Sequence, residues 1–399
     1  MQTFTRVVSR SFAFLLVGTL TACGAIPPDR EGTAPPGPQY SPEGYERGGE
    51  DMSGPYEVVP NWPQPIGLPG LTFGRTASVY AESPDRVFVL QSAMLPVRTP
   101  SNPPPLIYYL PWRSAVTAEG QVSTHIVTTY DRNGKLKEAW TQWDDLFRLP
   151  HRIRTNPYDP ERPIWVVDNS ANSVFKFSND GSELLMRIGE LQEGDDETHF
   201  HGPNDIAFLP NGDFFVVESH HRLTKWSAAG TLLLEKKMIG LEPGRFGNLH
   251  SVDVDARQRV YVADWGRAAG ETQQQGMQAG LDRGRLQIFD ADLNYLDEWP
   301  HMLRVGSVRI STDQRFLYGT DDTYNKLLQY DLATGRLLSS WGTYGARPGN
   351  LVGPHDLSVD TEGNLYVPEI YGGRVQKFRP RDGAPAARIV GRLYKEHLE

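Results

Sequence analysis

The chain repeats itself, and this repeat limits the folds open to it more than any other feature. From about residue 56 one pattern returns: a strand, a turn, a second strand that ends in a carboxylate, another turn and a third strand. Two clear copies are "GPNDIAFLPNGDFFVVESHHRLTKWSAAG" from Gly202 and "GPHDLSVDTEGNLYVPEIYGGRVQKF" from Gly353. Alternating apolar and polar residues between turn residues are typical of β-strands. A long period of this kind is typical of repeat architectures.

Equivalent positions in successive copies are separated by the length of one four-stranded blade. We call them mouth positions, because in a propeller they would lie at the mouth of the central channel. They lie 53, 46, 56 and 49 residues apart: His151, Asn204, His250, Gly306 and His355. A looser copy starts at Arg75 and finishes downstream in "THIVTTYDRNG". The repeat resembles the NHL type of β-propeller. We therefore expect an all-β, six-bladed propeller over residues 56–399, with "YEVVPNW" as the last blade's fourth strand. A seventh blade before residue 75 is the alternative, but that stretch has little patterned sequence.

The first 55 residues do not follow the repeat. Arg6 and Arg10 precede an apolar run, "FAFLLVGTLTA", which is placed like a signal-peptide core and is short for a membrane span. The "LTAC" that ends at Cys23 resembles the bacterial lipobox, where the cysteine is acylated; a chance cysteine is the alternative. We expect residues 1–22 to be a lipoprotein signal peptide. Residues 23–55, rich in proline, glycine and charge, should be a disordered tether.

A lipid anchor at Cys23 would place the protein outside the cytoplasm, on the periplasmic side of a bacterial membrane. Gly24 in the next position favours the outer membrane of a Gram-negative cell, by analogy with its sorting rules. Cys23 is the one cysteine of the chain, so the fold must be stable without an internal disulfide. A net charge of −9 without a basic stripe argues against nucleic acid as a partner. We expect a monomer.

Three of the mouth positions carry histidine. The first strand of each propeller blade lines the central channel, so residues at one repeat position converge at the channel mouth. His151, His250 and His355 occupy alternate blades and would approach one point from three sides. Neutral imidazoles in this arrangement suit zinc or a similar cation and leave coordination positions open for water or substrate. A solvated histidine cluster is the alternative.

A second repeat position carries a carboxylate at the end of the second strand. Its occupants are Asp168, Glu218, Asp264, Asp321 and Glu369. Each could be nominated as a catalytic acid or base. Because all five copies have a carboxylate there, we interpret this carboxylate position as a structural fixture that accepts backbone N–H bonds in the following turn.

Longer stretches resemble peptidyl-α-hydroxyglycine α-amidating lyase. They include "LFRLPHRIRTNP", "HFHGPNDIAF", "NLHSVDV" and "GPHDLSV", and the resemblance runs from about residue 56 to 380. That family is a six-bladed propeller that splits an α-hydroxyglycine-extended peptide into a peptide amide and glyoxylate. The resemblance implies zinc at His151, His250 and His355. It also implies a structural calcium held by Asp356 and by the main-chain carbonyl of Ile153; a plain structural aspartate is the alternative.

The catalytic positions of the family are not matched. Ser92 and Trp265 stand where the family has arginines, Gly353 where it has a methionine, and His220 where it has the catalytic tyrosine. An imidazole is a competent base near neutral pH, so His220 is our candidate base and Arg267 a candidate substrate clamp. The alternatives are a solvent-facing "SHHR" turn and a plain surface loop after Arg267.

Two function hypotheses therefore stay open. In the first, the protein is a metal-dependent lyase-like enzyme, acting on a carbon–nitrogen bond of a small-molecule or peptide substrate at the channel mouth. In the second, the catalytic set has decayed, and the propeller binds a protein or glycan partner on its top face. A streptogramin-lyase-like propeller is a third, weaker possibility.

Overall fold

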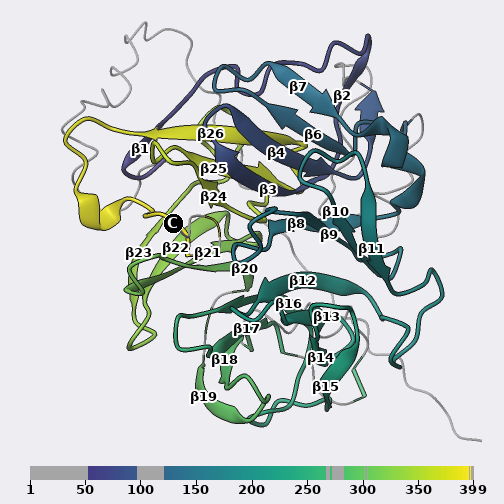
Figure 1. The fold of residues 1–399 in the computed structure, drawn as a ribbon. Coiled ribbons are helices and arrows are strands. Elements are labelled where there is room, and N and C mark those ends of the chain that lie inside the picture. Colours follow the sequence, from purple (N-terminus) through teal and green to yellow (C-terminus); the bar gives the residue numbers. More distant parts are fainter. Residues whose placement is uncertain are drawn as a thin grey trace, which may run out of the picture. The chain divides into compact units, whose positions relative to one another are not determined.

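The structure is a computed structural model that describes residues 53–96, 121–266, 270–271, 283–300, 302, 304–394 and 396. These residues lie within one compact unit. Six four-stranded antiparallel sheets make up the six blades of a β-propeller, as the repeat predicted (Figure 1). The expected signal peptide, Cys23, residues 24–52 of the expected tether and Arg267 lie outside the described residues. Residues 53–55, which were expected to belong to the disordered tether, form a buried turn instead.

The first three blades follow one another along the chain, and each takes its four strands in chain order. Blade 1 contains β3 (Thr76–Ser83), β4 (Arg86–Gln91), β6 (Val127–Tyr130) and β7 (Leu136–Ala139). Blade 2 contains β8 (Pro150–Thr155), β9 (Ile164–Asp168), β10 (Ser173–Phe177) and β11 (Leu184–Ile188). Blade 3 contains β12 (Pro203–Phe208), β13 (Phe214–Glu218), β14 (Arg222–Trp226) and β15 (Leu232–Lys237).

The remaining blades complete the ring, and the last of them takes its outer strand from the N-terminal side. Blade 4 contains β16 (Leu249–Val254), β17 (Val260–Asp264), β18 (Arg285–Phe289) and β19 (Tyr295–Trp299). Blade 5 contains β20 (Val305–Ile310), β21 (Phe316–Asp321), β22 (Lys326–Asp331) and β23 (Leu337–Trp341). Blade 6 contains β24 (Ser358–Val359), β25 (Leu365–Glu369), β26 (Arg374–Pro380) and β1 (Tyr56–Val58).

Strand β1 closes the ring, which confirms the prediction for "YEVVPNW". It pairs antiparallel with β26, with Tyr56 opposite Pro380, and Figure 1 shows the purple strand beside the yellow one. A separate two-stranded sheet pairs β2 (Leu71–Phe73) with β5 (Met94–Pro96). Two 3₁₀ helices, η4 (Thr141–Leu146) and η6 (Ala386–Arg388), lie in connections. No helix in the described ranges has the length and apolar character needed to cross a membrane.

The carboxylate positions are structural, as predicted. Asp168 accepts hydrogen bonds from the backbone N–H groups of Arg148, Leu149 and Ala171 at 2.7–2.9 Å. Asp264 accepts three from the backbone as well and also bonds the buried guanidinium of Arg285. These carboxylates therefore bind the loop that enters the first strand of their own blade, and this loop positions the residues at the channel mouth.

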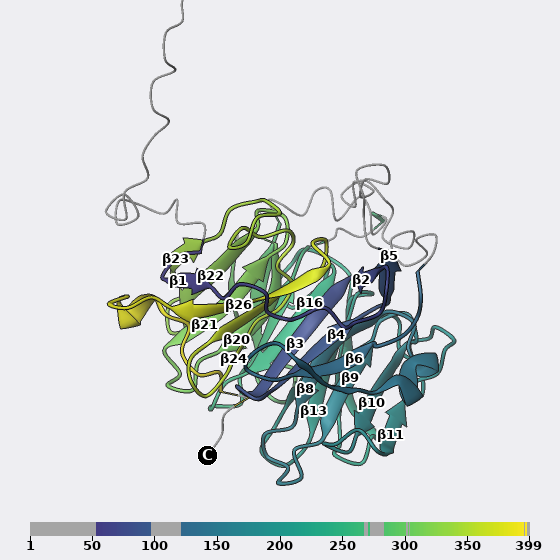
Figure 2. The same cartoon turned by 90° about the horizontal axis from the view of Figure 1, so that it is seen from above.

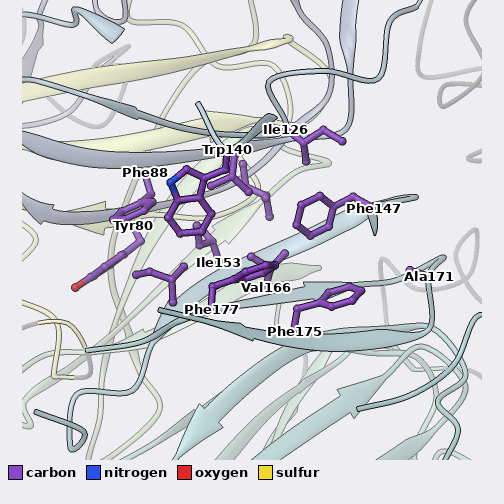
Figure 3. Close-up of a cluster of buried hydrophobic side chains, with 13 residues drawn as sticks. Tyr80, Phe88, Ile126, Trp140, Phe147, Ile153, Val166, Ala171, Phe175 and Phe177 are labelled. Carbon is purple, nitrogen blue, oxygen red and sulfur yellow. The ribbon is translucent and has the colours of Figure 1, made fainter. Parts of the chain in front are cut away.

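Six hydrophobic clusters seal the six boundaries between neighbouring blades. At the boundary of blades 1 and 2, Phe88 and Trp140 pack toward Phe175 and Phe177 (Figure 3). Every side chain in this cluster is at most 4% exposed. Because each blade buries both faces against a neighbour, the first strands are held in a closed ring. Strands β3, β8, β16 and β20 lie toward its middle in Figure 2.

Candidate metal centre

A backbone irregularity at the mouth positions turns two consecutive side chains into the channel. In β8 the pairing register shifts between Pro150 and Arg152, which leaves His151 as the extra residue. The same shift occurs in β3, β12, β16 and β20, at the mouth position each time. A β-bulge breaks the strict alternation of side chains. A mouth residue and the residue after it can therefore both face the channel, which alternation alone does not predict.

The structure brings His151, His250 and His355 together. One potential ligand nitrogen from each lies within 4.8 Å of the others, and the three side chains are 0%, 4% and 1% exposed. Their ring centroids are 4.8–5.0 Å apart, and the rings stand nearly perpendicular to one another. Among the described residues, this is the group of His, Cys, Asp or Glu side chains whose geometry could hold a metal ion.

Each histidine is oriented by a carbonyl of the next blade around the ring. The Nδ1 atoms of His151, His250 and His355 lie 2.7, 2.6 and 2.7 Å from the carbonyl oxygens of Asn204, Gly306 and Ala77. A carbonyl accepts hydrogen only, so we assign the ring proton to Nδ1. This leaves Nε2 as the nitrogen able to bind a metal. A hydrogen bond of this kind commonly orients metal-binding histidines.

Two further observations fit a metal ion at this position. Nε2 of His151 is buried and has no hydrogen-bond partner within the described part of the chain. Burial, followed by the positive charge of Arg152, holds the pKa of all three histidines well below its usual value. They are therefore neutral imidazoles at physiological pH, which is the form that ligates zinc and similar ions.

Arg152 lies against the histidines. Its Nη1 is 2.8 Å from Nδ1 of His355, and its Nη2 is 2.5 Å from the carbonyl oxygen of Gly306. The carbonyl oxygen of His151 is a second acceptor for Nη1, at 3.2 Å. The guanidinium can thus bond to carbonyl oxygens while Nδ1 of His355 keeps its proton. Arg152 also places a fixed positive charge directly beside the histidines.

Trp265 places a second arginine next to the histidines. Its ring stacks on His250 with the centroids 3.9 Å apart and the planes 19° from parallel. The guanidinium carbon of Arg304 lies 3.9 Å from the centroid of the same tryptophan, and Arg304 lowers the pKa of His250. Nε of Arg304 is buried without a partner among the described residues. The tryptophan that stands in a family arginine position therefore supports an arginine from the next blade.

A tyrosine and an aspartate complete this side of the mouth. Tyr371 Oη donates to Asp322 Oδ2 at 3.1 Å. Burial and then Asp322 raise the pKa of Tyr371, while the charges of Arg304 and Arg75 act to lower it. Burial lowers the pKa of Arg75 to about 10, and this arginine also acts on all three histidines. Arg75 and Arg304 are therefore electrostatic neighbours of the histidines, and Tyr371 is a neighbour of these two arginines.

These residues were not selected from the sequence, although one signal was available. Tyr371 lies two residues after Glu369, so it occupies in blade 6 the repeat position that His220 occupies in blade 3. Gly353 makes room for it. A Cβ at Gly353 would lie 2.3 Å from the Tyr371 ring, and its φ of +69° is one that glycine adopts readily.

Of the two candidate catalytic residues chosen from the sequence, the structure describes His220. His220 stacks on His201 with the centroids 3.3 Å apart. Nε2 of His201 in turn lies 3.2 Å from Glu193. His220 thus belongs to a histidine pair in blade 3 rather than to the group of His151, His250 and His355. Arg267 falls outside the described residues.

The expected calcium ligands do not fit a calcium ion. Asp356 Oδ2 pairs with Arg154 Nη1 at 2.8 Å, and Asp356 Oδ1 pairs with Arg309 Nη2 at 2.7 Å. The main-chain carbonyl of Ile153 accepts a hydrogen bond from Arg154 Nη1 at 2.8 Å. Both proposed ligands are bonded to arginine, whose positive charge would repel a cation. The expectation of calcium at Asp356 and Ile153 is therefore corrected.

Comparisons with known proteins are consistent with this fold and site. The chain is 27% identical over 280 residues to peptidyl-glycine alpha-amidating monooxygenase B of Xenopus laevis, covering 65% of this chain and 29% of that protein. It is 26% identical over 273 residues to peptidyl-alpha-hydroxyglycine alpha-amidating lyase 1 of Drosophila melanogaster, covering 61% and 47%. It is 25% identical over 270 residues to NHL repeat-containing protein 3 of Mus musculus, covering 64% and 72%.

The chain thus spans less than half the length of the first two relatives. No protein-family model matches it. A solved structure of unknown function from Bacteroides thetaiotaomicron shares the fold, with a TM-score of 0.51 at 11% identity, covering 77% of this chain and 70% of that one. The chain is therefore a six-bladed propeller whose homologues are amidating lyases and NHL repeat proteins.

Proposed function

We propose that this protein is a metal-dependent lyase that acts on an α-hydroxylated substrate bearing a carboxylate. One observation carries the proposal: three buried, neutral histidines present Nε2 toward a shared position, and two arginines lie next to them. The named lyase among the relatives supports the reaction class. Zinc fits the three nitrogen donors, and when bound it would act as a Lewis acid on a substrate oxygen.

Arg75 and Arg304 would bind the substrate carboxylate. Both are 9% exposed, so each can reach the channel mouth while most of its surface is packed. A guanidinium offers a planar pair of N–H donors that matches a carboxylate. Because the Arg304 guanidinium packs on Trp265, which in turn stacks on His250, it is held in place and loses little freedom on binding.

Tyr371 would handle the proton of the substrate hydroxyl. Tyr371 Oη donates a hydrogen bond to Asp322. When Oη takes up the proton of the substrate hydroxyl, it can pass its own phenolic proton to the Asp322 carboxylate. Loss of the hydroxyl proton allows a carbonyl to form while the carbon–nitrogen bond breaks, and the leaving nitrogen gains a proton. From an α-hydroxyglycine peptide the products are a peptide amide and glyoxylate.

The test is glyoxylate release from an α-hydroxyglycine-extended peptide by the zinc-loaded full chain. We expect turnover in the wild type, loss of turnover in His250→Ala and Tyr371→Phe, and no change in Arg315→Met, which alters an exposed arginine. If this peptide is inert, other α-hydroxylated acids and esters should be screened. A zinc-loaded protein that converts none of them would contradict the proposal.

A binding module is the second candidate. Of the three relatives compared above, the one matched over the largest share of its own length is an NHL repeat-containing protein. In that case the histidines hold a metal for structure, and the top face of the propeller binds a protein or glycan. A zinc-loaded chain without turnover that binds a defined glycan or protein, and loses binding in Arg75→Met/Arg304→Met, would favour it.

We also propose that Cys23 is acylated and anchors the protein to the periplasmic side of a bacterial membrane. Support comes from the apolar run before Cys23 and from the Pro/Gly-rich stretch after it. Intact-mass measurement of membrane-extracted protein would show the lipid on the wild type, and Cys23→Ala would release the protein into the soluble fraction. An unmodified Cys23 would contradict the anchor.

A further inference from the structure

A second ring of polar side chains lies next to the histidines. Its members are the residues that follow each mouth position, and in the first five blades a bulge accompanies that position: Ser78, Arg152, Asp205, Ser251, Ser307 and Asp356. Two more arginines, Arg154 and Arg309, reach the same carboxylates from further along β8 and β20. The group contains three arginines and two aspartates, and we call it the ion cluster.

Both carboxylates of the ion cluster are paired with guanidinium groups. Asp205 lies 3.2–3.6 Å from nitrogen atoms of Arg152, Arg154 and Arg309. Asp356 lies 2.7–2.8 Å from nitrogen atoms of Arg154 and Arg309. The five side chains are 0–8% exposed. Buried charges of this kind persist only when paired and hydrogen-bonded.

Three serines satisfy the remaining acceptor positions. Ser78 donates to Asp356 Oδ2 at 2.5 Å, and Ser307 donates to Asp356 Oδ1 at 2.8 Å. Ser251 donates to Asp205 Oδ2 at 2.6 Å. Each aspartate is thus bonded by arginines and serine hydroxyls together. A divalent ion would need these same carboxylate oxygens and would have to displace at least one guanidinium.

The charge balance also opposes a second ion. Three guanidiniums against two carboxylates leave the ion cluster with one excess positive charge. A calcium ion would add two more in a buried site, where charge repulsion is weakly screened.

Glu396 lies beside the arginines of the ion cluster. Glu396 is 4% exposed; its Oε2 accepts a hydrogen bond from Ser358 and its main-chain carbonyl accepts one from Arg162. A cavity of about 20 Å³ remains between Glu396, Arg154 and Arg309. Glu396 Oε1 and the Nε atoms of both arginines lack partners among the described residues. Two donors and one carboxyl oxygen in so small a space suit a water molecule.

We propose that the guanidinium groups of Arg154 and Arg309 take the place of a second, structural cation in this propeller. The folded chain then holds a single divalent ion, in the ring of histidines. Removing that ion leaves the ion cluster intact, so the blades stay assembled without metal. This inference concerns the ion cluster alone and does not depend on the proposed reaction.

The test measures metal binding and stability of the full chain. We expect the chain to bind a single equivalent of zinc and to show no calcium binding by titration calorimetry. The midpoint of urea unfolding should be the same with added calcium as with a calcium chelator. Stripping zinc should leave the far-UV circular dichroism spectrum unchanged. Stoichiometric calcium binding that raises the midpoint, and that is lost in Asp356→Asn, would overturn the proposal.

A gain-of-function variant sharpens the test. Arg154→Ser/Arg309→Ser leaves Asp356 and the Ile153 carbonyl without a guanidinium partner, and leaves Asp205 with Arg152 alone. Calcium should then bind this variant and raise its unfolding midpoint. Arg315→Ser, at a side chain 69% exposed, should show no calcium effect. A folded double variant that ignores calcium would contradict the substitution. If the double variant does not fold even with calcium, the wild-type titration decides.

Discussion

Gly353→Ala should displace Tyr371 from the channel mouth. Gly353 has a φ of +69°, and an added Cβ would lie 2.3, 3.0 and 3.1 Å from three carbons of the Tyr371 ring. Contacts under 3.0 Å are essentially never found for real Cβ atoms, so the ring has to retreat by about 0.7 Å or more. The left-handed backbone costs an alanine about 1–2 kcal/mol, and overpacking adds about 1–3 kcal/mol.

Gly363→Ala is the matched control in the same blade. Its φ is +84°, but nothing lies within 4 Å of the added Cβ, so only the backbone cost of about 1–2 kcal/mol applies. The assay is urea unfolding of both variants, together with glyoxylate release. We expect Gly353→Ala to be the less stable and to lose turnover, while Gly363→Ala keeps it.

The Tyr371→Ser background isolates the ring contact. Without the ring, Gly353→Ala should cost no more than Gly363→Ala, because only the backbone term remains. Equal stability and equal turnover of the two alanine variants in the wild-type background would refute the placement of Tyr371 against Gly353.

Three more predictions follow from individual contacts. Asp264→Asn should lower the free energy of unfolding by about 3–5 kcal/mol, because it removes the buried carboxylate that pairs with Arg285 and leaves this arginine with Glu298 alone. A loss under about 1 kcal/mol in urea unfolding would count against the structural role. Burial raises the pKa of Glu396 from 4.5 to about 8, with Ser358 and Arg154 lowering it and Asp356 raising it. The folded chain therefore holds a proton that the unfolded chain releases. This contribution to stability is complete below about pH 4.5 and is lost as the pH rises through about 8, so Glu396→Gln should flatten that slope in urea midpoints, and an unchanged slope would contradict the shift. Arg304→Met should raise KM for a carboxylate substrate about tenfold or more with a smaller change in kcat, whereas an unchanged KM would remove Arg304 from substrate binding.

The features that recur in every copy of the repeat could be predicted from the sequence. The six blades, the closing strand at Tyr56–Val58 and the structural use of Asp168 and Asp264 all follow from one pattern read in several copies. The convergence of the three histidines follows as well, because equivalent first strands surround one channel. Position in the repeat is thus enough to place these residues.

The features that were missed come from breaks in regular alternation and from contacts between blades. The bulge at His151 turns Arg152 toward the other histidines, and no residue pattern marks a bulge of this kind. Arg304 reaches His250 only through Trp265, which belongs to another blade. Tyr371 carried a signal in its repeat position, but the resemblance to the lyase family pointed to His220 in blade 3 instead.

Metal content of the full chain and its histidine variants tests the metal centre most directly. Elemental analysis of protein purified without chelator should give a single equivalent of zinc or a similar divalent ion. That ion should be lost in the triple variant His151→Ala/His250→Ala/His355→Ala. His220→Ala, which alters the histidine pair with His201, should retain it. Metal that is absent from the folded wild type after zinc is supplied, or that persists in the triple variant, would contradict the assignment of these histidines as ligands.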